Sequence, residues 1–368
     1  MAVPVTADQL AALNANHQMS VRIELLTEGV SSGEVPFIDG SVTATFTAQV
    51  TRNGQLRVPL SVVQSGQLNP LTDKCVIFTG IPGIYEVPVF TGRVVSYTKT
   101  SDQVVSVILA DTSRDIVRAR FEEPWRAVKG ATAASEMVRI VSDVSGEIGI
   151  DVTQTPDIIN PYAVWEEDRG KALDDLASTM SCIWQGNRFG DLIVYPNPYS
   201  TSAMPTIVAL LKDGADGNIT DISEVVSAEN IANSVTVVVE RTDNSPPIRI
   251  TARDQNPLSP TRWGGPFGKQ NITRKTNNPL TREAAQLIAF RILNQSLALF
   301  RSWQINTPHF PIFDPGDVIA VNWNNEITGQ VIESITYPLE AIDKTVLSTR
   351  ELRREEEFET VLGNTGTT

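Results

Sequence analysis

The sequence predicts a mainly β protein with an α/β insertion: two barrel-like antiparallel β domains joined to a small helix-and-hairpin domain. Three observations carry this prediction. Period-two or β-branched runs fill residues 19–117 and return after residue 201, separated by clusters of Gly, Pro, Asn and Asp. Two amphipathic helical patterns lie between these regions, in 118–200, and one long helical pattern interrupts the second region at 281–300. Short strands at such regular spacing are typical of antiparallel barrels and sandwiches.

The N-terminal segment, residues 1–18, is expected to form a helix or arm, because Thr6 and Gln9 have the spacing of a capping box. The first β-barrel domain is expected over residues 19–117, with a return of the chain to it near 201–228. Its strands are predicted from the runs "SVRIELLT", "GSVTATFTAQV", "LRVPLSVV", "KCVIFTGI", "VFTGRVVSYTKT" and "QVVSVILAD".

The inserted α/β domain is expected over residues 118–200. Thr132 can cap one helix, in "TAASEMVRIVSDVSGE", and a second helix is predicted to start near Asp168, in "DRGKALDDLASTM". The run "CIWQGNRFGDLIVYP" then predicts a hairpin with residues 187–190 in its turn.

The second β-barrel domain is expected over residues 229–350 and contains the long helix 281–300, capped by Thr281. Apolar residues nearly surround this helix, so it should be buried on most sides. The end of the chain, residues 351–368, reads as a charged C-terminal tail with too little apolar surface to fold alone, which predicts ordering by a neighbouring protein.

Composition and charge exclude several classes of protein. A chain of 368 residues can hold two or three domains, and it has no run of 18 apolar residues, so no integral membrane segment is expected. The net charge of -13 disfavours tight DNA binding, because nucleic-acid binders present Lys and Arg to phosphates. The two cysteines, Cys75 and Cys182, stand far apart, which predicts buried thiols and neither a disulfide framework nor a zinc site.

Candidates for catalysis are weak. The string "GVSSG" matches a nucleophile elbow centred on Ser31, but an elbow requires a strand, a sharp turn and a helix, and a strand pattern follows Ser31. A hairpin loop is therefore preferred. The histidines, His17 and His309, belong to no catalytic or metal-binding array, so packing or surface roles are expected. We predict no enzymatic activity, no cofactor and no metal site.

Two further kinds of polar motif favour plain interpretations. Three pairs of adjacent carboxylates occur, Glu122/Glu123, Glu166/Glu167 and Asp174/Asp175. Adjacent residues do not share a helix face, so solvated charge is expected rather than a paired acid and base. The Gly-rich "WGGPFGK" of residues 263–269 lacks the spacing of a phosphate loop.

Asp314, Pro315, Gly316 and Asp317 lie between two strand-like runs, in "FPIFDPGDVI". We predict a structural turn, because Pro-Gly fits the central positions of a type II turn, where Gly supplies the positive φ. A metal loop would need more oxygen ligands, and an acid/base dyad would need a cleft. Gly316→Val should strain such a turn by about 1 kcal/mol or more. Asp314→Asn should be nearly silent, because Asn keeps an acceptor.

Several stretches occur in the order and spacing of a known family. They are "ENIANSVTVVVE", "ITARDQNPLSP", "TREAAQLIAFRIL", "TPHFPIFDPGDVIAV" and "GQVIESITYPLEAIDKTVLSTREL". In the middle, "WEEDRGKALDDLASTMSCIWQGNRFGDLIVYPNP" is similar to the helix-plus-hairpin unit of that family. From about residue 20 to 352 the chain resembles the tail hub, or baseplate hub, family of tailed bacteriophages and related contractile injection particles. The first barrel matches in pattern more than in motif.

The resemblance implies a structural virion protein of the tail, assembled in the host cytoplasm. It implies a homotrimer whose two barrel-like domains per chain form a pseudo-sixfold ring. The implied partners are the tail tube or distal tail protein, a tip, spike or fibre protein, and a tape measure protein. DNA would pass through the channel without specific binding, which an acidic lumen would favour. Exposed strand edges of neighbouring chains could pair to close the ring.

Two alternatives stay open from the sequence. One is a distal-tail or tube-type ring protein, and the other is a β-rich hydrolase that uses Ser31 or a carboxylate pair. The mass of the assembled protein separates a trimeric hub from a monomeric enzyme.

Overall fold

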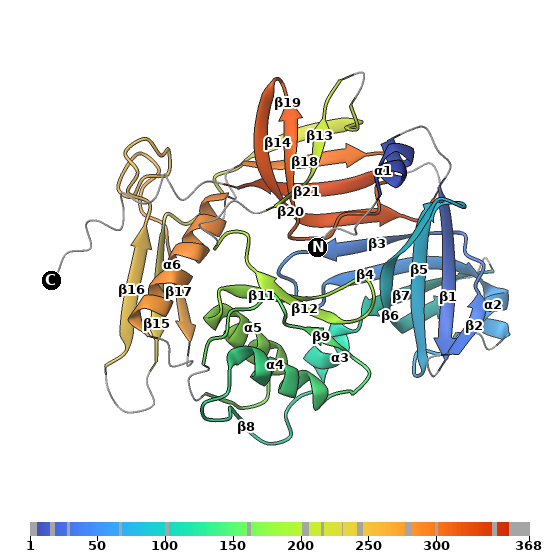
Figure 1. The fold of residues 1–368 in the computed structure, drawn as a ribbon, viewed down its shortest axis with the longest axis horizontal. Helices are drawn as coiled ribbons and strands as arrows, with labels where there is room; N and C mark the ends of the chain where they lie inside the picture. Colours follow the sequence, from blue (N-terminus) through green and yellow to red (C-terminus); the bar gives the residue numbers. More distant parts are fainter. Residues whose placement is uncertain are drawn as a thin grey trace.

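The structure is a computed structural model that describes residues 6–14, 19–27, 30–65, 68–99, 103–159, 163–200, 206–214, 217–229, 231–240, 246–276, 281–298, 301–340 and 344–352. It has four regions (Figure 1). The N-terminal strands lie on the right of the view, the last strands of the chain at the top, a helical insert at the lower centre and a smaller insert on the left.

Seven strands build the first region, which we call the N-terminal β-half. They are β1 (Ser20–Thr27), β2 (Val30–Glu34), β3 (Asp39–Thr45), β4 (Arg52–Pro59), β5 (Asp73–Ile81), β6 (Tyr85–Lys99) and β7 (Val104–Asp111). Two helices accompany them, α1 (Ala7–Asn14) and α2 (Leu60–Gln64). In β4 the inward positions alternate strictly with exposed ones, as the period-two pattern predicts. The capping box is confirmed, since the backbone N–H of Gln9 donates to Thr6 Oγ1 at 3.2 Å and that of Thr6 donates to Gln9 Oε1 at 2.9 Å.

Six strands build the C-terminal β-half. They are β13 (Ile207–Lys212), β14 (Asp221–Val226), β18 (Arg301–Thr307), β19 (Val318–Trp323), β20 (Glu326–Pro338) and β21 (Thr345–Glu351). Antiparallel pairing of β20 with β3 joins the two halves into one 13-stranded sheet. The predicted fold class, mainly β with an α/β insertion, is confirmed. The two regions expected as separate barrels are thus continuous, and residues of both bury one shared apolar core.

The segment 201–228 does not return to the N-terminal β-half. Within it, β13 pairs in parallel with β19, and β14 pairs antiparallel with β18. Leu211 of β13 and Ile219, just before β14, are buried in the same core cluster as Ile319 of β19. These apolar contacts and the backbone pairing hold the segment in the C-terminal β-half.

The first insert, residues 112–200, is an α/β unit. Its elements are α3 (Ser113–Arg118), β8 (Trp125–Arg126), α4 (Ala133–Ser142), β9 (Ile150–Asp151), β10 (Val164–Trp165), α5 (Arg169–Thr179), β11 (Cys182–Gly186) and β12 (Leu192–Pro196). The caps at Thr132 and Asp168 and the β11–β12 hairpin are confirmed. The insert buries a core of its own, in which α4 and α5 face β11 and β12.

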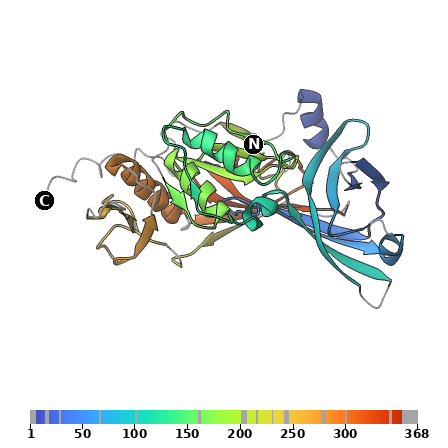
Figure 2. The same cartoon turned by 90° about the horizontal axis from the view of Figure 1, so that it is seen from below.

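The second insert, residues 231–298, contains β15 (Ser234–Val239), β16 (Ile248–Arg253), β17 (Asn271–Thr276) and α6 (Arg282–Leu297). Sequence analysis placed these strands and the long helix in the second barrel. Instead β15 pairs with β16 on one edge and with β17 on the other, so no edge of β15 is left for the large sheet. Thr281 caps α6 as predicted, and α6 covers one face of this small sheet (Figure 2).

No helix in the described part of the chain combines the length and apolar character that crossing a membrane would require.

Candidate functional site

Residues 314–317 form a tight turn. The backbone N–H of Asp317 donates to the carbonyl oxygen of Asp314 at 3.1 Å, and Gly316 has φ +88°, the conformation that position i+2 of a type II turn requires. The N–H of Gly316 also donates to Ile332 O at 2.8 Å, which ties the turn to β20. A Cβ at Gly316 would lie 2.3 Å from Tyr195 Oη and 2.8 Å from the Phe46 ring, so glycine is also required by close approach.

Asp314 contacts two buried arginines from two other regions. Its Oδ1 lies 2.5 Å from Arg52 Nη2, at the start of β4, and 2.8 Å from Arg188 Nη2, in the β11–β12 hairpin. All three side chains are at most 7 % exposed. One carboxylate therefore connects the N-terminal β-half, the first insert and the C-terminal β-half. We call Arg52, Arg188 and Asp314 the Asp314 junction.

Backbone carbonyl groups complete the Asp314 junction. Arg188 donates to Pro311 O at 2.6 Å and to Phe313 O at 2.5 Å, and Arg52 Nη1 donates to Gly186 O. The carbonyl of Pro315 accepts from Gln185 Nε2 at 3.2 Å and from Tyr195 Oη at 3.1 Å. The guanidinium donors are thus used within the protein, which is the condition for a buried charge to be tolerated.

The two carboxylates of the turn differ in pKa. Burial alone would raise the pKa of Asp314, but Arg188 and Arg52 hold it well below its usual range. Burial raises the pKa of Asp317 to about 6, and the negative charge of Asp314 adds to this increase. Its Oδ2 accepts the backbone N–H of Asp314 at 2.8 Å. The pKa values of the two groups therefore differ in the way that those of a catalytic acid and base do. Both side chains nevertheless lie inside a packed junction, where Asp314 is 5 % and Asp317 is 7 % exposed.

The expectation that Asp314→Asn is nearly silent assumed that the side chain only caps the turn. The structure instead shows its carboxylate in contact with two buried cations, so loss of its charge should be costly. Sequence analysis also missed Arg52 and Arg188. A signal for Arg52 was available: it shares the inward phase of β4 with Leu56 and Val58. A basic residue in the apolar phase of a strand predicts a buried partner.

A second buried contact connects the end of the first insert to β20. Tyr199 Oη donates to Glu333 Oε1 at 2.7 Å, and Arg350 Nη2 lies 3.4 Å from Glu333 Oε2. Burial raises the pKa of Glu333. Phe46 packs against Tyr199 with ring centroids 6.2 Å apart, and its N–H donates to Glu333 O at 2.7 Å. The first insert is therefore fixed to both β-halves at two places.

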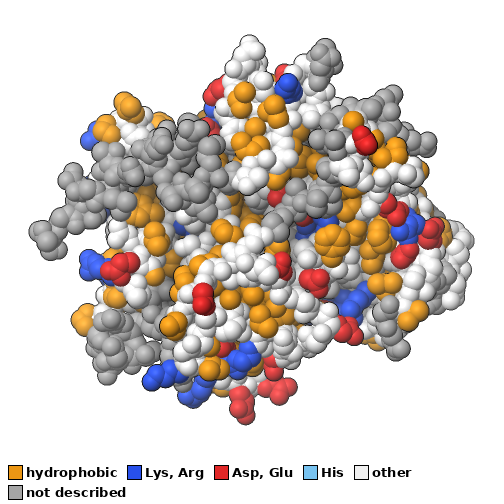
Figure 3. Space-filling view, viewed as in Figure 1, with side chains coloured by type: hydrophobic (Ala, Val, Ile, Leu, Met, Phe, Trp, Pro, Cys, Tyr) orange, Lys and Arg blue, Asp and Glu red, His pale blue; other side chains and the backbone are white. Residues whose placement is uncertain are grey.

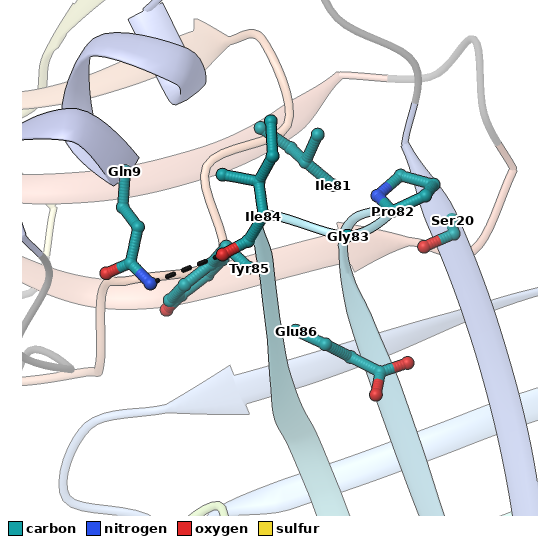
Figure 4. Close-up of a pocket in the computed structure, with 8 residues that line it drawn as sticks. All are labelled: Gln9, Ser20, Ile81, Pro82, Gly83, Ile84, Tyr85 and Glu86. Atoms are coloured by element: carbon teal, nitrogen blue, oxygen red, sulfur yellow. Dashed lines mark hydrogen bonds between the residues drawn. The ribbon is translucent and has the colours of Figure 1, made fainter.

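A shallow surface pocket of about 500 Å³ lies where α1 meets the β5–β6 turn (Figure 4). It is lined by Gln9, Ser20, Ile81, Pro82, Gly83, Ile84, Tyr85 and Glu86. Gln9 Nε2 donates to the carbonyl oxygen of Ile84 at 3.4 Å, and Leu13 of α1 is buried in the main core. Glu86 forms an ion pair with Arg22 at 2.9 Å. The hydrogen bond of Gln9 and the burial of Leu13 are the contacts that hold α1 against the strands.

Ser31 and His309 occupy different settings. Ser31 is exposed in the edge strand β2, where its Oγ accepts the N–H of Gly33 at 3.3 Å. The β1–β2 pair is a hairpin and not the strand, turn and helix of a nucleophile elbow. His309 is buried, with its Nε2 2.6 Å from Thr79 Oγ1 and its ring against Tyr337. His17 lies outside the described residues.

The remaining candidates of the sequence have structural surroundings. Cys75 and Cys182 are free and buried, and burial raises the pKa of the Cys75 thiol to about 12 and that of Cys182 to about 11. Asp174 accepts the indole N–H of Trp184 at 2.7 Å, whereas its neighbour Asp175 accepts that of Trp165 at 3.0 Å. The two adjacent carboxylates thus point to different partners.

The described residues contain no metal-binding cluster, and the face drawn in Figure 3 shows no large patch of one charge sign. Among the described residues no cluster of three or more His, Cys, Asp or Glu could hold a metal ion. On the face that Figure 3 shows, acidic and basic side chains are interspersed with hydrophobic ones.

The strand order ends in β2 on one side and β14 on the other, and each has exposed apolar residues. Val30 in β2 is 70 % exposed, and Val225 and Val226 in β14 are 52 % and 57 % exposed. Edge strands with exposed apolar side chains are suited to pairing with another chain.

Comparisons with known proteins agree on the fold. No family model matches the chain, and no curated protein matches it in sequence. Solved structures match at low identity. The 43 kDa tail protein of prophage MuSo2 from Shewanella oneidensis is 13 % identical with TM-score 0.64, over 92 % of this chain and 100 % of that one. The tail protein from Neisseria meningitidis MC58 is 14 % identical with TM-score 0.67, and the match covers 91 % of this chain and 97 % of that one.

A third similar structure comes from a secretion system. The E. coli c3393 protein, a component of the type VI secretion system described as similar to the T4 tail proteins gp27 and gp5, is 11 % identical with TM-score 0.52. The match covers 90 % of this chain and 77 % of that one. The chain therefore has the fold of phage tail and related injection-system proteins, and the resemblance seen in the sequence is confirmed at the level of fold.

Proposed function

We propose that this chain, which has the fold of phage tail proteins, is a structural virion protein: the trimeric tail hub at the distal end of a tail tube. It links the tube to a tip, spike or fibre protein and forms part of the channel through which DNA passes. The observation that carries the proposal is the extent of the likeness, which spans 92 % of this chain and the whole of the Shewanella tail protein.

The two β-halves of each chain support the proposed number of copies. Each chain supplies two sheet-rich halves joined at β3 and β20, so three chains supply six such units around one axis. A trimer of this kind matches a sixfold tube. The open edges β2 and β14 are suited to pair between neighbouring chains and close the ring.

The proposed role is structural and not enzymatic. Ser31 lies on an exposed edge strand, His309 is packed against Thr79 and Tyr337, and the two perturbed carboxylates of the turn are inside a packed junction. Any cleavage of a cell wall would then belong to other proteins of the particle.

Light scattering on the purified protein tests the proposal. Three copies of the 40.2 kDa chain give about 121 kDa, and that mass is expected. A stable monomer of 40.2 kDa that binds no tail tube protein would refute the hub. Imaging of assembled particles distinguishes the alternative of a distal-tail or tube-type ring, which would show six copies in the ring.

A further inference from the structure

The second insert carries charge of the opposite sign to the rest of the chain. Residues 231–298 contain nine Lys and Arg against four Asp and Glu, a net charge of +5, in a chain whose net charge is -13. The remaining residues therefore carry -18. One of the four acids, Asp254, is buried and accepts hydrogen bonds from Ser259 and Thr261 at 2.5 and 2.6 Å. The surface of this insert is thus strongly basic.

Strand register concentrates part of this charge on one face. Val235, Val237 and Val239 of β15 pack under α6, so the residues that alternate with them face the other way. The outward positions of the three paired strands are Ser234, Thr236, Val238, Arg249, Thr251, Arg253, Asn271, Thr273 and Lys275. Three of these nine are basic and none is acidic. Figure 2 shows α6 on the opposite side of the sheet.

The cations of this face have few carboxylate partners. Arg249 and Arg253 are exposed, and neither forms an ion pair with any described residue. Lys275 lies 3.8 Å from Glu240, and both side chains are more than half exposed. Beside the sheet, Arg253 and Lys269 lie over the Trp263 ring, 5.1 and 5.7 Å from its centroid. Cation–π contacts stabilise such neighbouring like charges.

We propose that this basic face, formed by Arg249, Arg253, Lys269 and Lys275, docks onto an acidic surface of a second copy of this chain. The proposal rests on the proposed function in one respect, since it requires that several copies assemble. The two surfaces are different parts of the chain, so the contact is head-to-tail, the type that generates rings.

The first insert offers the acidic counterpart. Residues 112–200 contain fourteen Asp and Glu against nine Lys and Arg, a net charge of -5. Pairing of β8 with β10, extended by a bond from Phe121 N–H to Glu167 O at 3.0 Å, places Glu122 and Glu123 beside Glu166 and Glu167. All four glutamates are exposed. We call them the acidic edge.

A second copy fits the basic face better than a nucleic acid does. A polyanion longer than the face would be repelled by the remaining chain, whose net charge is -18. Phosphate binding also depends on many basic contacts. Arg253 and Lys269 already lie over the Trp263 ring, so a base that stacked on the ring would have to compete with them. An acidic protein surface of limited size avoids both problems.

Charge reversal in the full-length protein tests the contact. We expect Arg249→Glu/Arg253→Glu to weaken self-association about tenfold, measured by sedimentation velocity, because each exposed ion pair contributes a few-fold and its reversal adds repulsion. The matched control, Lys99→Glu/Lys212→Glu, has the same change in net charge on exposed residues of the β-halves and should associate like the wild type. Raising the salt concentration should weaken the wild type more than Arg249→Glu/Arg253→Glu.

The reciprocal variant decides whether the acidic edge is the partner. Glu122→Arg/Glu123→Arg should also weaken association, and a chain that carries both reversals should regain most of the wild-type affinity. This pattern of loss and recovery supports the inference whatever the number of copies in the wild-type assembly. A number other than three would refute only the proposed trimer.

Three results would overturn the inference. If the wild type forms a trimer and Arg249→Glu/Arg253→Glu associates equally well, the basic face is not a contact between copies, and the proposed function is unaffected. A wild type that stays monomeric at every salt concentration would refute both the docking of the basic face and the proposed trimeric hub. Loss without recovery in the reciprocal chain, or binding of a short DNA duplex by the wild type but not by Arg249→Glu/Arg253→Glu, would assign the basic face to another partner.

Discussion

Replacing Asp314 by Asn should reduce the free energy of unfolding by about 3–5 kcal/mol, the range found when one partner of a buried ion pair is removed. The change keeps the shape of the side chain and leaves the backbone of the turn intact. It removes the carboxylate that both Arg52 and Arg188 contact. Each arginine is 1 % exposed, so water cannot replace the lost counter-charge. Asp111 accepts the backbone N–H of Arg52 at 2.7 Å, and Asp314 is the carboxylate that lies within ion-pair distance of the guanidinium.

Asp317→Asn is the matched control, because it makes the same isosteric change three residues away in the same turn. The Asn oxygen can still accept the backbone N–H of Asp314, now 2.8 Å from Asp317 Oδ2. Because burial raises the pKa of Asp317, its negative charge is unfavourable in the folded state. We therefore expect a change in unfolding free energy of about 1 kcal/mol or less.

Urea unfolding followed by tryptophan fluorescence measures both variants, with equal m-values as the check that the unfolded states are comparable. A double variant with Arg188→Met should cost less than the sum of its single changes, because Asp314 and Arg188 each leave the other charge unpaired. Surface substitutions usually change the free energy of unfolding by less than about 0.5 kcal/mol. If the unfolding free energies of Asp314→Asn and Asp317→Asn differed by less than this amount, the Asp314 junction would not stabilise the fold as argued.

Three further outcomes are expected. Gly316→Ala should lower the thermal midpoint, with a cost of about 1–3 kcal/mol, because the new Cβ would have positive φ and lie 2.3 Å from Tyr195 Oη; an unchanged midpoint would contradict this. The stability of Asp317→Asn relative to the wild type should rise between about pH 4 and pH 6, because the pKa of Asp317 is raised to about 6 and the wild type pays to ionise it there; a relative stability that is flat or falls would count against the raised pKa. Ser31→Ala should leave assembly unchanged, because its exposed Oγ makes one 3.3 Å hydrogen bond; loss of a hydrolase activity would restore a catalytic interpretation.

Features that depend on neighbours in sequence could be predicted. The caps at Thr132, Asp168 and Thr281 and the alternating pattern of β4 involve residues within one or two turns of each other. The hairpin of β11 and β12 is likewise local. In each case the residue that determines the structure and the backbone it acts on are only a few positions apart.

Partners that lie far apart in sequence could not be predicted in the same way. Arg52 and Asp314 are separated by 262 residues, and a turn with two aspartates looks the same whether solvent or two arginines surround it. The run that became β15 is apolar enough for a barrel strand, but which strands pair with it depends on β16, β17 and α6 together. Strand propensity predicts that a strand exists and does not select its partner.

The β3–β20 pairing determines whether the two β-halves can change their relative angle during assembly. Five residue pairs join β3 to β20, from Ser334 with Thr45 to Pro338 with Ser41, so backbone hydrogen bonds and not a linker connect the halves. The Asp314 junction adds a buried charge contact across the same boundary. Domains joined by small polar interfaces move against each other, whereas the β3–β20 pairing continues one sheet and one apolar core. The angle between the halves is therefore set within each chain. The proposed ring would have to close through contacts between chains, at β2, at β14 and at the basic face of the second insert.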